Sequence, residues 1–134
     1  MKQNPYMPIS ATIDQIVDET PSIKTFGLRP QEPIAFEAGQ FVELLVPGLG
    51  EAPFTPSSSP AITDRMEITI MRVGQLTRHL FTLEPGAKVG VRGPFGAGYP
   101  LDELRGRDVI VVGGGCGVGP LRALLFAMFE EVES

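Results

Sequence analysis

A run of closely spaced glycines near the C-terminal end has the composition of a phosphate-binding turn. The run, 113–120, reads GGGCGVGP and separates a β-branched stretch from one with helical apolar spacing. Glycines there let the backbone turn tightly and let a phosphate approach the first amides of the next helix, where the helix dipole attracts an anion. A strand before the run and a helix after it strengthen this interpretation. The alternative is a plain turn between strand and helix.

The only cysteine, Cys116, lies inside this run. We interpret it as a small residue that fills space rather than as a reactive thiol, because nothing else nearby marks a nucleophile. A single cysteine excludes an internal disulfide. It also excludes a four-cysteine iron–sulfur or zinc site made by this chain alone, so we expect no metal ligands.

Three earlier segments combine glycine or proline with hydroxyl and aromatic residues. The stretch 52–60 reads APFTPSSSP and places an aromatic ring, a threonine and three serines on an extended segment. An ordinary solvated loop is the alternative there. Gly74 is followed three residues later by Thr77 at the start of a short helix, which again offers free amides and a hydroxyl. A third glycine-rich turn, RGPFGAGYPL, occupies 92–101.

Charge and hydropathy exclude some classes of partner. The 134 residues include 16 acidic and 11 basic ones, a net charge of −5. This disfavours DNA or RNA, because phosphate binding needs a basic surface. No stretch approaches the roughly 20 apolar residues of a transmembrane helix, and the first residues lack the apolar core of a signal peptide. We expect a cytoplasmic protein without a membrane span.

The first two-thirds of the sequence predicts short antiparallel strands. RMEITIMRVG alternates Met66, Ile68 and Ile70 with residues of the opposite face. Several such stretches between proline and glycine turns are typical of a barrel or sandwich. With three prolines, 50–60 can be extended but not a central strand, and 75–86 is the one helical interruption. The expected strands are 10–20, 22–30, 40–48, 65–74 and 87–96.

The pattern changes near 104–108, where we place a boundary between domains 1–104 and 105–134. The stretch 108–112 is apolar on both faces, as in a strand buried within a parallel sheet. Pro120 suits a helix start, and an apolar stripe follows it. We interpret this part as the first βα unit of an incomplete α/β nucleotide-binding domain. The stripe consists of Leu121, Leu124, Leu125, Met128, Phe129 and Val132.

These segments, in this order, resemble the ferredoxin reductase-like flavoproteins. In that family R-x-Y-[ST], G-x-x-[ST], G-P-[FY]-G and G-G-x-G-x-x-P motifs follow one another, and the likeness here runs from about Pro5 to the C-terminus. The sequence of these stretches looks most like that of the gamma (diaphorase) subunit of hydrogenase and sulfhydrogenase complexes. The dihydroorotate dehydrogenase electron-transfer subunit is a close relative of that subunit. The resemblance implies a mainly β protein whose antiparallel Greek-key barrel binds FAD. The matching segments are 52–55, 74–77, 93–96 and 114–120.

The resemblance also assigns roles to single residues. Phe54 matches the aromatic residue that lies against the isoalloxazine ring, and Thr55 the hydroxyl near flavin N5. Leu76 and Thr77 would supply amides and a hydroxyl to the pyrophosphate. The glycine-rich run would begin the pyridine-nucleotide site. The expected cofactor-binding residues are Pro53, Phe54, Thr55, Pro56, Ser57, Met71, Arg72, Val73, Gly74, Leu76, Thr77, Gly114, Gly115, Gly117 and Pro120.

Ala52 is the main departure from the family pattern, because many relatives have arginine on the pyrophosphate there. Flavin affinity would then depend on Arg72 or Arg78 for the charge. His79, the only histidine, follows on the same helix. A surface position is favoured for it over contact with the adenylate half of the cofactor.

The implied activity is electron transfer between NAD(P)H and iron–sulfur or hydrogenase subunits through FAD. The chemistry needs no acid–base pair, so we expect no catalytic side chains. NAD(P) would bind only with the remainder of the second domain, and the family's [2Fe–2S] centre has no ligands in this chain. We expect little NAD(P)H oxidation from the 134 residues alone, and self-association through 108–134. The alternatives are a non-catalytic flavin-binding subunit and a cofactor-less β-barrel scaffold.

Overall fold

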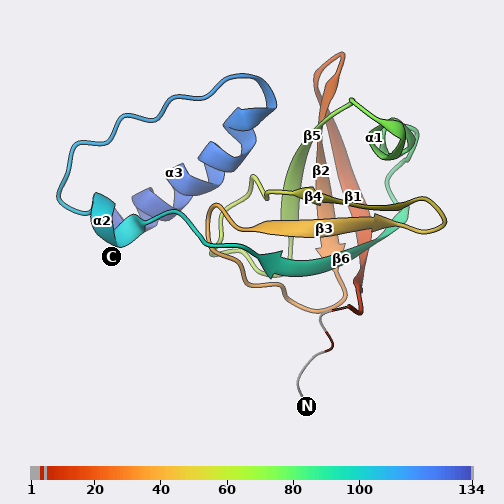
Figure 1. Cartoon of the computed structure of the whole chain (residues 1–134), viewed down its shortest axis with the longest axis horizontal. Helices are drawn as coiled ribbons and strands as arrows, with labels where there is room; N and C mark the ends of the chain where they lie inside the picture. Colours follow the sequence, from red (N-terminus) through yellow and green to blue (C-terminus); the bar gives the residue numbers. More distant parts are fainter. Residues whose placement is uncertain (1–3, 5, 134) are drawn as a thin grey trace.

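The computed structural model describes Asn4 and residues 6–133, and its centre is an antiparallel sheet that curls on itself (Figure 1). In the described chain this sheet has six strands in the order β4-β3-β6-β1-β2-β5, and every neighbouring pair is antiparallel. The mainly β fold class expected from the sequence is confirmed. The strands are β1 (Ile9–Thr20), β2 (Ile23–Pro30), β3 (Phe41–Val46), β4 (Gly50–Phe54), β5 (Met66–Met71) and β6 (Lys88–Phe95).

The segment after β4 joins the two edge strands of the sheet. Pro56 forms an antiparallel bridge with Ile68 of β5. The backbone amide of Ser57 donates to the carbonyl of Glu67 at 2.8 Å, and the amide of Glu67 donates to the Ser58 hydroxyl at 3.0 Å. The sheet therefore closes into a barrel, and this stretch of β5 is not left as a free edge.

Alternation along the strands builds the barrel interior. Met66, Ile68 and Ile70 are at most 2% exposed, as their spacing predicts, while Glu67 and Thr69 between them lie on the outer face. The helix expected in 75–86 is also present but ends earlier. Other buried side chains of the same core are Ala11, Ile13, Phe26, Leu28, Ile34, Phe36, Val42, Leu44, Val46, Leu80, Val89 and Val91.

One short helix lies beside the barrel, and a second short helix lies next to the longer helix on the opposite side (Figure 1). Within the described residues, none of them has both the length and the apolar character that crossing a bilayer requires. The helical elements are α1 (Gln75–Leu80), α2 (Leu101–Leu104), the 3₁₀ turn η1 (Gly115–Gly117) and α3 (Val118–Glu133).

The strand expected at 108–112 is not formed, so this prediction is wrong. The chain runs from α2 to η1 as an irregular arc that stands away from the barrel (Figure 1). Ile110 and Val112 are 89% and 85% exposed. A strand exists through hydrogen bonds to a neighbour, and no described strand pairs with this stretch. Its β-branched composition alone cannot hold it in a sheet.

The helix after Pro120 is confirmed, but only half of the expected stripe contributes to its packing face. Leu124 is buried, and Leu121 and Met128 are half-buried against the same cluster. Leu125, Phe129 and Val132 are exposed. The buried face is made mostly of small residues, which let the helix backbone approach the barrel closely. Part of the helix is thus covered by the barrel itself. The buried residues of α3 are Gly119, Ala123, Leu124 and Ala127.

Candidate cofactor site

The aromatic and hydroxyl residues after Ala52 lie at the end of edge strand β4. Phe54 pairs with Val42 of β3, and its half-buried ring packs against the barrel core. Pro53 is exposed, and an edge strand tolerates it because fewer of its amides are needed for pairing. Thr55 is half-buried where the chain leaves the sheet. An aromatic ring and a hydroxyl therefore occupy adjacent positions.

The proline and serines that follow are buried and bound, not solvated. The Ser57 hydroxyl accepts a hydrogen bond from Thr69 of β5 at 3.1 Å, and Ser59 donates to Glu130 of α3 at 2.7 Å. The serine run thus connects the end of β4 to β5 and α3 through hydrogen bonds. This excludes the alternative that 52–60 is an ordinary solvated loop. Whether any member contacts a cofactor stays a prediction. The buried residues of the run are Pro56, Ser57, Ser58 and Ser59.

One hydroxyl shapes the turn from β5 into α1. Thr77 Oγ1 accepts hydrogen bonds from the amides of Val73 and Gly74, at 2.9 and 2.8 Å, and donates to the Gly74 carbonyl at 3.0 Å. The first amides of a helix have no partner within it, and Gly74 brings no side-chain cap. The backbone amides of Gln75, Leu76 and Thr77 are therefore the groups of this turn that could receive an anion, because the Thr77 hydroxyl is already bonded within the turn.

This turn and the end of β4 are neighbours in the fold. α1 packs beside β4, and Leu76 and Phe54 contact the same core. A Cβ built at Gly74 would meet no other atom within 4 Å, so the space beside the turn is open. Met71 is half-buried, and Val73 is 70% exposed. The structure thus brings together the two segments that the sequence assigned to one ligand.

Basic side chains lie close to the same turn. The Arg72 guanidinium lies 5.7 Å from the centre of the Phe81 ring, and the Lys24 ammonium lies 5.2 Å from that ring. Arg78 and His79 are exposed in the last turn of α1. The residue beside the end of β5 is therefore an arginine held by an aromatic ring. Together with the free amides, it can bind an anionic group.

The residues described around Ala52 supply no free positive charge in place of the family arginine, because the nearby Arg92 is bound to Glu51. Glu51 accepts hydrogen bonds from Arg92 at 3.1 and 2.6 Å. These bonds lower the pKa of Glu51 from its ordinary value, so it stays ionised and paired. The third glycine-rich turn follows Arg92, whose guanidinium lies 5.3 Å from the centre of the Phe95 ring. Arg92 is thus engaged on β6 and does not replace the family arginine.

The C-terminal glycine run packs its 3₁₀ turn beside β5. Gly115 has φ of 59°, a left-handed conformation that favours glycine. Gly114 and Gly117 are exposed and joined by a 3.2 Å backbone hydrogen bond, and Pro120 is half-buried at the start of α3. A pocket of about 670 Å³ lies between this turn and the barrel. Its lining includes Glu19, Thr25, Glu67, Thr69, Val118 and Arg122.

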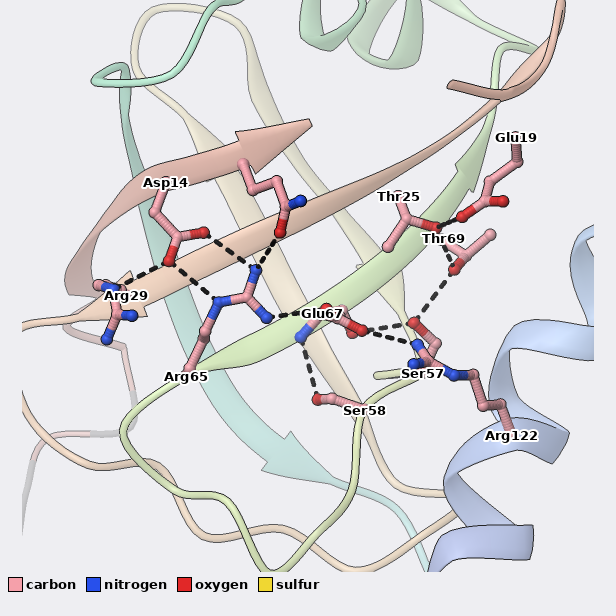
Figure 2. A network of polar contacts seen from close by, with 11 residues as sticks. Asp14, Glu19, Thr25, Arg29, Ser57, Ser58, Arg65, Glu67, Thr69 and Arg122 are labelled. Carbon is pink, nitrogen blue, oxygen red and sulfur yellow. Dashed lines mark hydrogen bonds and ion pairs between the residues drawn. The ribbon is translucent and has the colours of Figure 1, made fainter. Parts of the chain in front are cut away.

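A chain of charged side chains joins the barrel to α3 beside that pocket (Figure 2). Arg65 donates to Asp14 of β1 at 3.0 Å and to Glu67 of β5 at 2.8 Å. Arg122 of α3 donates to the other oxygen of Glu67 at 2.6 Å, and Arg29 of β2 pairs with Asp14 at 2.9 Å. The chain of contacts therefore spans three strands and the helix.

The two carboxylates of this network have pKa values below their ordinary ones. Partial burial acts to raise the pKa of Asp14, but the hydrogen bonds and charges of Arg65 and Arg29 outweigh it and lower that pKa. Burial likewise acts to raise the pKa of Glu67, and Arg65 and Arg122 together lower it below its ordinary value. Both acids are charge partners and not proton donors near neutral pH.

A row of hydroxyls runs beside the charged network (Figure 2). Thr69 lies 3.1 Å from Ser57 and 2.9 Å from Thr25, and Thr25 donates to Glu19 at 2.8 Å. Thr25 and Thr69 are cross-strand partners on β2 and β5. The outer face of these strands is therefore polar and bonded where α3 begins.

Sequence reasoning singled out none of the charged residues of this network. The signal available was Gly27, a glycine inside a strand, which often marks a close approach. A Cβ there would overlap the side chains of Arg65 and Asp14. Nothing in the sequence indicates that Arg122 of α3 pairs with Glu67, because that contact depends on how the helix packs.

Residues 10–99 match the family described as the oxidoreductase FAD-binding domain. A probable dihydroorotate dehydrogenase B (NAD(+)) electron transfer subunit from Methanocella arvoryzae is 43% identical over 117 residues, 87% of this chain and 42% of the relative. The sulfhydrogenase 1 subunit gamma of Pyrococcus furiosus is 37% identical over 131 residues, 93% of this chain and 45% of the relative. The chain thus spans less than half the length of these curated relatives.

Solved structures show the same fold. The Amycolatopsis cytochrome P450 reductase GcoB superposes with a TM-score of 0.81 at 29% identity, covering 94% of this chain and 40% of the other. Ferredoxin-NADP⁺ reductase from Plasmodium falciparum superposes with a TM-score of 0.78 at 14% identity, covering 93% and 54%. At that lower identity the likeness shows the fold alone.

Proposed function

The chain belongs to the family of oxidoreductase FAD-binding domains, and from this premise we propose that it is the electron-transfer module of an NAD(P)H-dependent oxidoreductase. Its FAD would pass electrons from a pyridine nucleotide to iron–sulfur or hydrogenase-type partner subunits. The relatives described as an electron transfer subunit and as a sulfhydrogenase gamma subunit support this role. The pyridine nucleotide and the partners are parts of the proposal.

The observation that carries the proposal is the packing of α1 beside β4. It brings the Phe54 ring close to a turn with free amides and an exposed arginine, Arg72. FAD joins a flat ring system, which can stack on an aromatic side chain, to an anionic pyrophosphate, which can bind free amides and an arginine. The residues present therefore fit FAD, even with Ala52 in place of the family arginine.

The side chains would act by placement and not by acid–base chemistry. A bound flavin accepts a hydride and releases electrons singly. Phe54 offers a ring surface to it and Thr55 a hydroxyl at its edge. Leu76 and Thr77 donate backbone amides to the pyrophosphate, and Arg72 contributes charge there. The barrel thus needs no catalytic proton donor of its own.

Gly114, Gly115, Gly117 and Pro120 are proposed for the pyridine-nucleotide side, with the domain boundary near 104–108. In the described residues 108–112 is not part of a sheet, and a nicotinamide pocket at the edge of an α/β sheet needs several strands. We therefore expect the 134-residue chain to oxidise NADH and NADPH slowly. Turnover comparable to that of a full-length relative would contradict this.

A second candidate function is flavin binding without NAD(P)H oxidation. The unpaired, exposed stretch 108–112 favours it, because the nucleotide side of the site is incomplete in the described chain. A protein that retains flavin but whose flavin is not reduced by added NADH or NADPH would support this role over the first.

Retention of flavin tests the proposed function. The whole chain is mixed with FAD, passed through a desalting column and examined for visible flavin absorbance. Phe54→Ala and Arg72→Ala should retain less than the unchanged chain, because one removes the ring surface and the other the charge. Arg107→Ala, on an exposed arginine outside the site, is the matched control. A colourless protein that ignores FAD would favour the cofactor-less scaffold.

A further inference from the structure

α3 meets the barrel through its smallest residues. Gly119 is buried, and a Cβ built on it would lie 3.1 Å from Cβ of Thr69 and 3.4 Å from Cβ of Ser57. Ala123 and Ala127 continue the buried face at successive turns of the helix. The start of α3 therefore rests directly on β5 and the serine run, with no room for a larger side chain at 119.

Two polar contacts clamp the same helix at separate points. Arg122 binds Glu67 of β5 at 2.6 Å, and Glu130 accepts from Ser59 at 2.7 Å. The two helix residues are eight positions apart, which is about two turns or roughly 12 Å along one face. Contacts at two heights on one face oppose both rotation of the helix and sliding along β5.

The barrel side of the Arg122 contact, Glu67, is itself fixed in place. Glu67 receives Arg65 at 2.8 Å, Arg65 binds Asp14 at 3.0 Å, and the Glu67 amide binds Ser58 at 3.0 Å. The Glu67 carboxylate is thus oriented by contacts other than the one with Arg122 (Figure 2). A preplaced partner costs less side-chain entropy when the ion pair forms.

We infer that Gly119, Glu67 and Arg122 are positioning residues that fix where the glycine-rich turn lies along β5. η1 lies beside β5, and Met71 and Arg72 follow at the end of that strand. A shift of α3 along β5 therefore moves the turn relative to the flavin-side residues. The meaning for electron transfer rests on the proposed function, but the clamp itself can be tested without flavin.

Cys116 reports the position of the turn without an added label site, because it is the only cysteine in the sequence and lies half-buried there. The rate of its reaction with a thiol reagent is measured on the whole chain. Arg122→Gln removes the ion pair and should react several-fold faster. Arg122→Lys keeps the charge and should stay near the unchanged rate. Gly119→Val should lift the helix and also react faster.

The matched control is Arg107→Gln, which makes the same change on an exposed arginine outside the clamp and should leave the rate unchanged. Flavin fluorescence quenching is followed on each variant. Faster labelling of Arg122→Gln with unaltered FAD affinity supports the positioning role. Labelling of both Arg122→Gln and Gly119→Val at the unchanged rate overturns it. Failure of every form to bind FAD overturns the proposed function instead, and the labelling rates still judge the clamp.

Discussion

An isoleucine of the barrel core is buried, whereas one in the arm that follows the barrel, residues 105–133, is exposed. Ile68 in β5 is 0% exposed, whereas Ile110 in the arm is 89% exposed. Ile68 has Phe26 of β2 as a cross-strand partner and Pro56 as a bridge partner. Ile110 pairs with no described strand. Whether a β-branched residue is buried therefore depends on the strands that pair with its segment, and not on the residue type alone.

The arm itself divides in the same way. The face of α3 that meets the barrel is buried through small residues and two polar clamps, as Gly119 and Ala123 illustrate. The exposed face carries larger side chains, among them Phe129 at 63% and Val132 at 83% exposed. Close packing on this barrel thus selects small residues, and bulk is left on the side without a partner.

The largest test of the contrast uses one substitution at two places. Ile68→Ala should reduce the free energy of unfolding by about 2–5 kcal/mol, because it leaves a cavity in a closed core. Ile110→Ala should change it by no more than about 0.5 kcal/mol, because that side chain is in water. Urea unfolding of the two variants gives both values. Similar losses at the two sites would break the comparison.

A smaller effect concerns pH, which should distinguish the partly buried ion pairs of the barrel from an exposed ion pair of the arm. The lowered pKa values of Asp14 and Glu67 mean that their ionised forms stabilise the fold above their ordinary values, 3.8 and 4.5, and that this is lost as pH falls through the lower folded values. Arg65→Gln should weaken that acid dependence by about 1 kcal/mol, since solvent screens part of the network.

The matched control for this effect is Arg105→Gln. Arg105 pairs with Glu131 on the exposed part of the arm at 2.9 Å and lowers the pKa of that carboxyl. Because solvent screens an exposed pair, we expect its loss to change the curve of unfolding free energy against pH less than Arg65→Gln does. An equal change in both variants would show that the barrel network contributes no more to the pH dependence of stability than an exposed ion pair does.

The smallest effect on stability should come from the exposed face of α3. Phe129→Ser should alter the free energy of unfolding by no more than about 0.5 kcal/mol. It should nevertheless weaken self-association through 108–134, because exposed apolar patches favour contact between molecules. Light scattering over a range of concentrations measures this. An unchanged chain that stays monomeric at high concentration would refute the expected self-association.

The barrel was predictable from sequence because its signals are local. Strict alternation at Met66, Ile68 and Ile70 gives the inward face of β5, and the prolines of 50–60 place β4 at an edge. The order of motifs also predicted that β4 and the β5–α1 turn would meet.

The remainder depended on contacts that no local pattern encodes. The stretch 108–112 has strand composition but no partner to pair with. The buried face of α3 combines Gly119 and two alanines with only half of the apolar stripe, because the helix approaches the barrel closely. Arg65 and Glu67 have no distinguishing pattern in the sequence, and the contact of Glu67 with Arg122 depends on how α3 packs.

The central claim is that the barrel binds FAD between the end of β4 and the β5–α1 turn, and a comparative flavin titration tests it most directly. The whole chain is titrated with FAD and with FMN while flavin fluorescence is followed. We predict that FAD binds at least about tenfold more tightly, about 1.4 kcal/mol, because the turn offers amides and Arg72 to a pyrophosphate. Arg72→Ala should remove more of that preference than Arg78→Ala. Equal and weak binding of the two flavins would contradict the claim.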